Sequence, residues 1–91
     1  MTYQFPRTIF ADTTTLDNQI TQIMMEACEM CRASADNEGL DRVVEEMLDT
    51  YHALETGFWI IEGLKGPGFM QTARDGVERK NRERGYYRDM T

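Results

Sequence analysis

The chain has 91 residues, the length of a single domain, and we treat residues 1–91 as one unit. Hydrophobic residues make up 41% of it and charged residues 29%, which fits a folded rather than a disordered chain. Its net charge of −6 argues against nucleic acid as a general partner, because a phosphate backbone attracts basic surfaces.

Residues 1–13 are predicted to form an extended arm. Pro6 prevents a regular helix across this segment. We expect the arm to lie on the body of the protein or on a partner subunit, and stacking of a base on Tyr3 or Phe5 is the alternative. The apolar side chains of the arm are Tyr3, Phe5, Ile9 and Phe10.

A first helix is predicted over residues 15–35. Thr14, followed three residues later by Asp17, resembles a capping box at its start. Glu26 and Glu29 lie to one side of the apolar stripe, where they would line a groove or form a solvated flank. The apolar residues recur at helical spacing and comprise Leu16, Ile20, Ile23, Met24, Ala27 and Cys31.

A second helix is predicted over residues 39–62, after a polar turn. Glu46 and Asp49 lie well away from its apolar stripe, so we expect them outside the core between the first two helices. Gly57 weakens the helix interior by up to ~1 kcal/mol, which a close helix contact would explain. The stripe comprises Leu40, Val43, Val44, Met47, Leu48, Tyr51, Leu54, Phe58 and Ile61.

A loop rich in glycine, residues 63–68, is predicted to stop the second helix. It lacks the Gly-Lys-Ser/Thr ending of a phosphate-binding P-loop. A third helix is predicted over residues 69–84. From Arg74 onward the chain carries six basic and four acidic residues, whereas the remainder carries four basic and twelve acidic ones. An acidic body with a basic tail could hold a metal ion and a polyphosphate together. Alternatively, the basic tail docks on the acidic body of the same chain.

Two acidic pairs stand out. Glu26 and Glu29 form E-x-x-E, and after sixteen intervening residues Glu46 and Asp49 form E-x-x-D. A step of three residues puts both members of a pair on one side of a helix, so two antiparallel helices would bring four carboxylates together. Such a group favours a hard cation, and Mg²⁺ is usual beside phosphates. The alternative is that both pairs lie on solvated helix faces, where this spacing is common.

Cys28 and Cys31 form a lone C-x-x-C. A zinc site needs about four ligands, and His52 is the one further soft candidate, so the cysteines are predicted to be reduced helix residues. We expect a cytoplasmic protein without a membrane partner, because no apolar run approaches the ~18 residues of a membrane span and the N-terminus lacks the pattern of a signal peptide.

The acidic motifs and the tail together resemble a known family. Residues 23–29 (IMMEACE), residues 42–49 (RVVEEMLD) and residues 80–86 (KNRERGY) are similar to motifs of the MazG-like all-α nucleoside triphosphate pyrophosphohydrolases, especially small phage and prophage members. The resemblance covers about residues 20–87. It implies an all-α fold, with an antiparallel helical hairpin and a third, C-terminal helix. It also implies a core like a four-helix bundle that is completed by oligomerisation, as a dimer or tetramer.

The resemblance also implies a hydrolase. Members cleave a nucleoside triphosphate between its α and β phosphates, releasing a nucleoside monophosphate and pyrophosphate. By position, Mg²⁺, or Mn²⁺ in its place, would be held by Glu26, Glu29, Glu46 and Asp49. Glu26 or Glu29 would also activate the attacking water. The candidates for contacts to the triphosphate or sugar are Lys80, Asn81, Arg84 and Tyr86.

Two positions depart from the family pattern. Met25 precedes Glu26, where members often have a second glutamate, and Val77 stands where a lysine is common. The short arm is also expected to offer no clear pocket for a base. The alternative function is therefore a helical module of the same fold that binds nucleotides or proteins without chemistry.

Overall fold

The computed structural model describes residues 1–88. Within these residues every regular element is a helix: α1 (Phe10–Thr13), α2 (Leu16–Ala35), α3 (Leu40–Lys65) and α4 (Phe69–Glu83). The predicted all-α class is confirmed. No helix in this part of the chain is long and apolar enough to cross a membrane.

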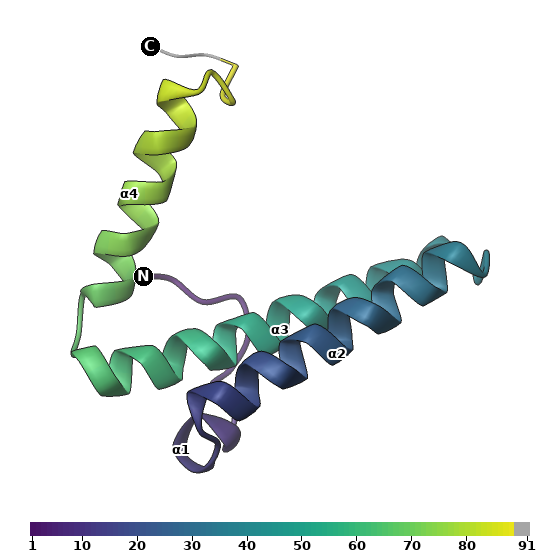
Figure 1. The fold of residues 1–91 in the computed structure, drawn as a ribbon, viewed down its shortest axis with the longest axis horizontal. Helices are drawn as coiled ribbons and strands as arrows, with labels where there is room; N and C mark the ends of the chain where they lie inside the picture. Colours follow the sequence, from purple (N-terminus) through teal and green to yellow (C-terminus); the bar gives the residue numbers. More distant parts are fainter. Residues whose placement is uncertain (89–91) are drawn as a thin grey trace.

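Helices α2 and α3 form a long antiparallel hairpin (Figure 1). Small residues let the two helices approach, since Ala33 is buried and α2 side chains lie over Gly57. A methyl group at Gly57 would lie 3.6 Å from Ile23 Cδ1 and 3.8 Å from Gln19 Cγ. The close helix contact predicted at Gly57 is therefore present, although it leaves room for a methyl group.

The helix bounds agree closely with the predicted ones. The cap of α2 lies one residue later than predicted, because Thr15 rather than Thr14 accepts a hydrogen bond from the Asn18 backbone N–H at 3.2 Å. Helix α3 continues through Gly63 to Lys65, so the prediction that residue 63 begins the stop is wrong. A single glycine only weakens a helix, and α3 ends where Gly66 adopts a φ of 97° before Pro67.

The N-terminal arm lies against α3 (Figure 1). Glu55, which is buried on α3, accepts hydrogen bonds from the backbone N–H groups of Gln4 at 2.7 Å and Phe5 at 2.9 Å. Tyr3 stacks on Trp59 with ring centres 4.3 Å apart. The arm therefore lies on its own body. The prediction that residues 1–13 are extended throughout is wrong at its end, because the last four form the single turn of α1.

The predicted apolar stripes form only part of the contact between α2 and α3, where Ile23 lies over Gly57, and this corrects our assignment of the core. Polar and small residues fill much of that contact, among them Gln19, Ala33 and Gly57. Eight large residues of the two stripes are exposed in the single chain. We call six of them the apolar face: Ile20, Met24, Val44, Met47, Tyr51 and Leu54.

The apolar face occupies one side of the hairpin. Ile20 follows Gln19 by one position and Met47 follows Glu46, and each earlier residue faces the other helix. One residue is about 100° of helical rotation, and in antiparallel helices this rotation turns both stripes to the same side. Residues that precede the contact positions, such as Asn18, turn to the opposite side, so the hairpin has two distinct faces.

Candidate metal centre

Three of the four predicted carboxylates come together between α2 and α3. Oxygen atoms of Glu26, Glu29 and Glu46 all lie within 4.8 Å of one another. Asp49 belongs to a second group with Glu45 and Glu46, which also lies within 4.8 Å. Glu46 is thus shared between the two groups, which form one continuous acidic cluster.

Glu46 is the centre of this cluster and is only 2% exposed. The prediction that Glu46 lies outside the contact between the two helices is wrong. About three helical turns separate Glu46 from Gly57, so both residues face α2. The prediction failed because it assumed that the apolar stripe marks the buried side of α3. Asp49 is exposed, as predicted.

The two oxygens of Glu46 have different surroundings. Oε1 pairs with Nη2 of Arg42 at 2.6 Å. Oε2 is buried and has no hydrogen-bond partner within residues 1–88. An ionised carboxylate oxygen that is buried without a donor is costly, and either a proton shared with Glu29 or a bound cation would remove that cost.

The electrostatics of the cluster disfavour a charged Glu46. Burial raises the pKa of the Glu46 carboxyl and Arg42 opposes this effect. The charges of Glu29 and Asp49 raise the pKa further, and so does a hydrogen bond that protonated Glu46 can share with Glu29. One arginine therefore does not compensate the cluster. Carboxylate oxygens are the ligands that Mg²⁺ and Mn²⁺ prefer, so these residues fit a hard divalent cation.

Sequence reasoning missed two members of this site. Glu45 joins the second acidic group, and the doubled Glu45-Glu46 was the available signal. Arg42 precedes Glu46 by four residues, the spacing at which charged side chains pair on a helix. Arg42 also pairs with Glu45 at 3.0 Å and with Glu38 at 3.6 Å.

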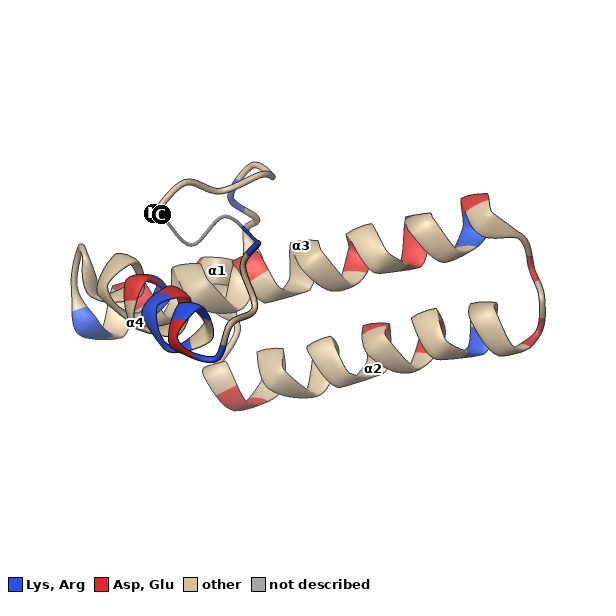
Figure 2. Ribbon diagram, turned by 90° about the horizontal axis from the view of Figure 1, so that it is seen from above, with Lys and Arg blue, Asp and Glu red and all other residues tan. Residues whose placement is uncertain are grey.

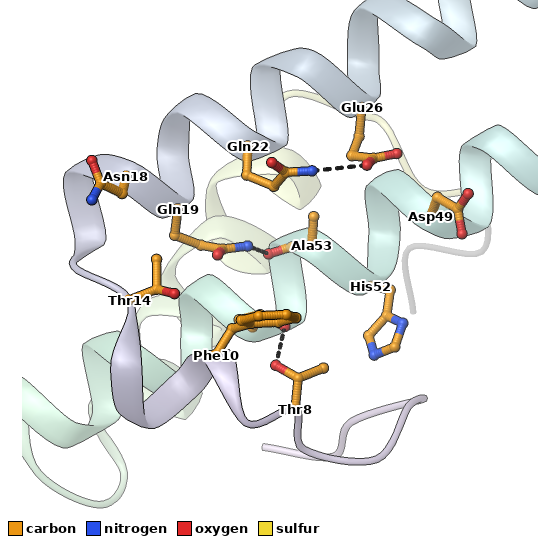
Figure 3. Close-up of a pocket in the computed structure, with 11 residues that line it drawn as sticks. Thr8, Phe10, Thr14, Asn18, Gln19, Gln22, Glu26, Asp49, His52 and Ala53 are labelled. Carbon is orange, nitrogen blue, oxygen red and sulfur yellow. Dashed lines mark hydrogen bonds between the residues drawn. The ribbon is translucent and has the colours of Figure 1, made fainter.

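A pocket of about 680 Å³ opens beside the cluster (Figure 3). Its lining residues include Asn18, which places it on the side of the hairpin away from the apolar face. Thr8 and Phe10 from the end of the arm form part of its wall, so the arm contributes to a pocket. The residues that line it from α2 and α3 are Asn18, Gln19, Gln22, Glu26, Asp49, His52, Ala53 and Thr56.

The predicted triphosphate contacts lie elsewhere in the single chain. Lys80 and Asn81 are on α4, and Arg84 and Tyr86 follow directly. Helix α4 leaves the end of α3 and points away from the hairpin (Figure 1). In Figure 2 the charged positions along α2 and α3 are mostly acidic, whereas those along α4 are both basic and acidic. The structure therefore does not bring these four residues to the carboxylates of the same chain.

The cysteine pair takes no part in the acidic cluster. Cys28 and Cys31 are both exposed and carry free thiols.

Comparison of the chain with protein families, with curated proteins and with solved structures found no match.

Proposed function

We propose that this protein is a Mg²⁺-dependent nucleoside triphosphate pyrophosphohydrolase of the MazG-like type. It cleaves between the α and β phosphates and releases a nucleoside monophosphate and pyrophosphate. One observation carries the proposal: the unpartnered Oε2 of buried Glu46, with oxygens of Glu26 and Glu29 within 4.8 Å. A purely structural protein gains nothing from this arrangement, because burying charges of like sign is unfavourable.

The carboxylates have separate roles in this proposal. Glu46 would be the buried ligand of the cation, and the exposed Glu29 and Asp49 would be further ligands. When bound, Mg²⁺ supplies positive charge against the phosphates and lowers the pKa of water. Glu26 or Glu29 accepts the proton of the attacking water, whose oxygen joins phosphorus as the bond to the α–β bridging oxygen breaks.

The basic tail acts on a second copy of the chain in this proposal. Lys80, Asn81, Arg84 and Tyr86 lie beyond the hairpin that carries their own carboxylates. The apolar face of the hairpin is exposed in the single chain, and burying it against another hairpin gives the bundle that the family resemblance implies. A homodimer is the smallest assembly that would bring tail and carboxylates together.

One observation favours the alternative of a binding module without chemistry. Arg42 already pairs with Glu46 at 2.6 Å, so part of the cluster is neutralised by the chain itself. In that case the cluster is a structural ion-pair network, and a nucleotide or protein binds elsewhere on the fold.

Pyrophosphate release distinguishes the two functions. Ribo- and deoxynucleoside triphosphates are incubated with Mg²⁺, Mn²⁺ or a chelator, using the native chain, Glu46→Gln, and Glu83→Gln as a matched control on the exposed end of α4. We expect metal-dependent pyrophosphate from the native chain and the control, and none from Glu46→Gln. A folded native chain that releases no pyrophosphate from any nucleotide would favour the binding module.

A further inference from the structure

The pocket beside the acidic cluster has a chemistry of its own. Its eleven lining residues, all in the described part of the chain, include no lysine and no arginine. Its charged side chains are Glu26 and Asp49, both from the acidic cluster, and the rest are amides, hydroxyls, rings and an alanine. Phosphates are therefore disfavoured in the body of this pocket, which suits an uncharged group that forms hydrogen bonds.

We propose that this pocket binds the nucleobase and sugar of a nucleoside triphosphate, and that Asn18 and Gln22 determine which base is accepted. The inference rests on the proposed function and extends it to the selection of the substrate. The volume of about 680 Å³ lies within the usual range of ligand pockets and admits a nucleoside.

The three amides in the pocket differ in what they can offer a ligand: Asn18 is available, Gln22 is partly engaged because its Nε2 donates to Glu26 Oε1 at 2.9 Å, and Gln19 is not available. Gln19 is 4% exposed and its Nε2 donates to the Ala53 carbonyl at 2.9 Å, so it is committed to the contact between α2 and α3. Asn18 and Gln22 are exposed on the pocket side of α2. Each amide presents a donor and an acceptor in one plane, the pattern that matches the polar edge of a base.

An aromatic ring at the pocket edge adds a stacking surface. Phe10 is 55% exposed although it is a large apolar residue, and it opens α1 at the wall of the pocket (Figure 3). The segment before it is tied to α3 by a 3.0 Å hydrogen bond between the hydroxyls of Thr8 and Thr56. A ring that is held at a pocket edge with exposed area is suited to stack on a base.

Further groups connect this pocket to the carboxylates. Gln22 Nε2 donates to Glu26 Oε1 at 2.9 Å (Figure 3). This hydrogen bond joins the proposed base contact, Gln22, to the candidate metal ligand, Glu26. His52 also lines the pocket, and its buried Nε2 has no partner within residues 1–88. A base held here would place its phosphates toward Glu26 and Asp49.

The test separates binding of the base from binding of the phosphates. Calorimetry in Mg²⁺ compares α,β-methylene nucleoside triphosphates, which cannot be cleaved at the α–β bridge, with inorganic tripolyphosphate, which has no base. The pocket variants are Asn18→Ala, Gln22→Ala and Phe10→Ala. Gln71→Ala and Phe69→Ala are matched controls, because they remove an amide and an exposed ring from α4.

We expect at least one methylene analogue to bind about tenfold more tightly than tripolyphosphate, the size of one good bidentate contact to a base. The pocket variants should lose this advantage, and the controls should keep it. Asn18→Ala should leave the affinity for tripolyphosphate unchanged, because Asn18 lies outside the acidic cluster.

Two results would overturn the inference. If analogues and tripolyphosphate bind equally, or if the pocket variants behave like the controls, the pocket does not hold the base, and pyrophosphate release still decides the proposed function. If neither kind of ligand binds in the presence of Mg²⁺, the base pocket and the proposed function are both wrong.

Discussion

Glu46 places an ionisable group in the contact between α2 and α3, where an apolar residue would be the usual choice. Its pKa is raised by burial and by Glu29 and Asp49, with Arg42 acting against them. The folded protein therefore holds the Glu46 proton more tightly than the unfolded chain does. In the pH range above the ordinary value of 4.5, ionisation of Glu46 opposes folding.

This linkage makes Glu46→Gln a test of stability as well as of activity. Without metal, Glu46→Gln should melt at a higher temperature than the native chain at pH 7, because an amide needs no ionisation and can still accept from Arg42. The difference should shrink as the pH falls to about 4.5, where the native carboxyl is protonated too. Thermal melts at several pH values measure this, and a variant that is less stable at pH 7 would contradict it.

Gly57 shows how a single helix position tests the contact between α2 and α3. A methyl group there would meet Ile23 and Gln19 at 3.6 and 3.8 Å, which are ordinary contact distances. Gly57→Ala should therefore raise the free energy of unfolding by about 0.5–1 kcal/mol, through helix propensity and loss of unfolded-state freedom. Urea unfolding measures the change, and a clear destabilisation would mean that the helices are closer than described.

Glu55 fixes the arm to α3, and through the arm it holds the wall of the pocket. Glu55→Gln keeps the size of the side chain but removes the charge that accepts from two backbone N–H groups. We expect a loss of about 1.5–3 kcal/mol in the attachment of the arm, the range for hydrogen bonds to charged groups. Hydrogen exchange at Gln4 and Phe5 should then become faster, with Glu83→Gln as the control, and unchanged exchange would count against this role.

The positions of the helices along the chain could be predicted from the sequence, whereas the contacts between them could not. Periodic apolar residues, a threonine cap and the glycines after Lys65 locate α2, α3 and α4 to within a few residues. The same periodicity misled us about the core, because Gln19, Glu46 and Gly57 are polar or small and carry no hydrophobic signal. The spacing of the acidic pairs identified Glu26, Glu29 and Glu46, which do come together, because helix geometry fixes which residues share a side. Spacing did not show that Asp49 joins a second group with Glu45.

The two sides of the hairpin are suited to different partners, a small ligand on one side and a second hairpin on the other. The acidic cluster and the pocket lie on one side and the apolar face lies on the other, so a second hairpin can cover the apolar face without closing the pocket. In the proposed assembly, the second hairpin would bury the six exposed side chains of the apolar face.

Met47 tests this use of the apolar face. It is 52% exposed in the single chain, so Met47→Ala should cost the isolated chain less than the 2–5 kcal/mol typical of a fully buried residue. Met47→Lys should instead dissociate a homodimer, because it would bury a charge in the interface. Light scattering after size exclusion measures the mass, with Leu64→Lys as an exposed control near the end of α3. A monomeric native chain would contradict the proposed assembly.

Calorimetric titration with Mn²⁺ at pH 7 shows whether the cluster around Glu46 binds a divalent cation. We predict saturable binding to the native chain and to Glu83→Gln, loss of that binding in Glu46→Gln, and weakening as the pH falls because Glu46 becomes protonated at a higher pH than an ordinary glutamate. Absence of binding, or equal binding to Glu46→Gln, would show that the cluster is a structural ion-pair network centred on Arg42.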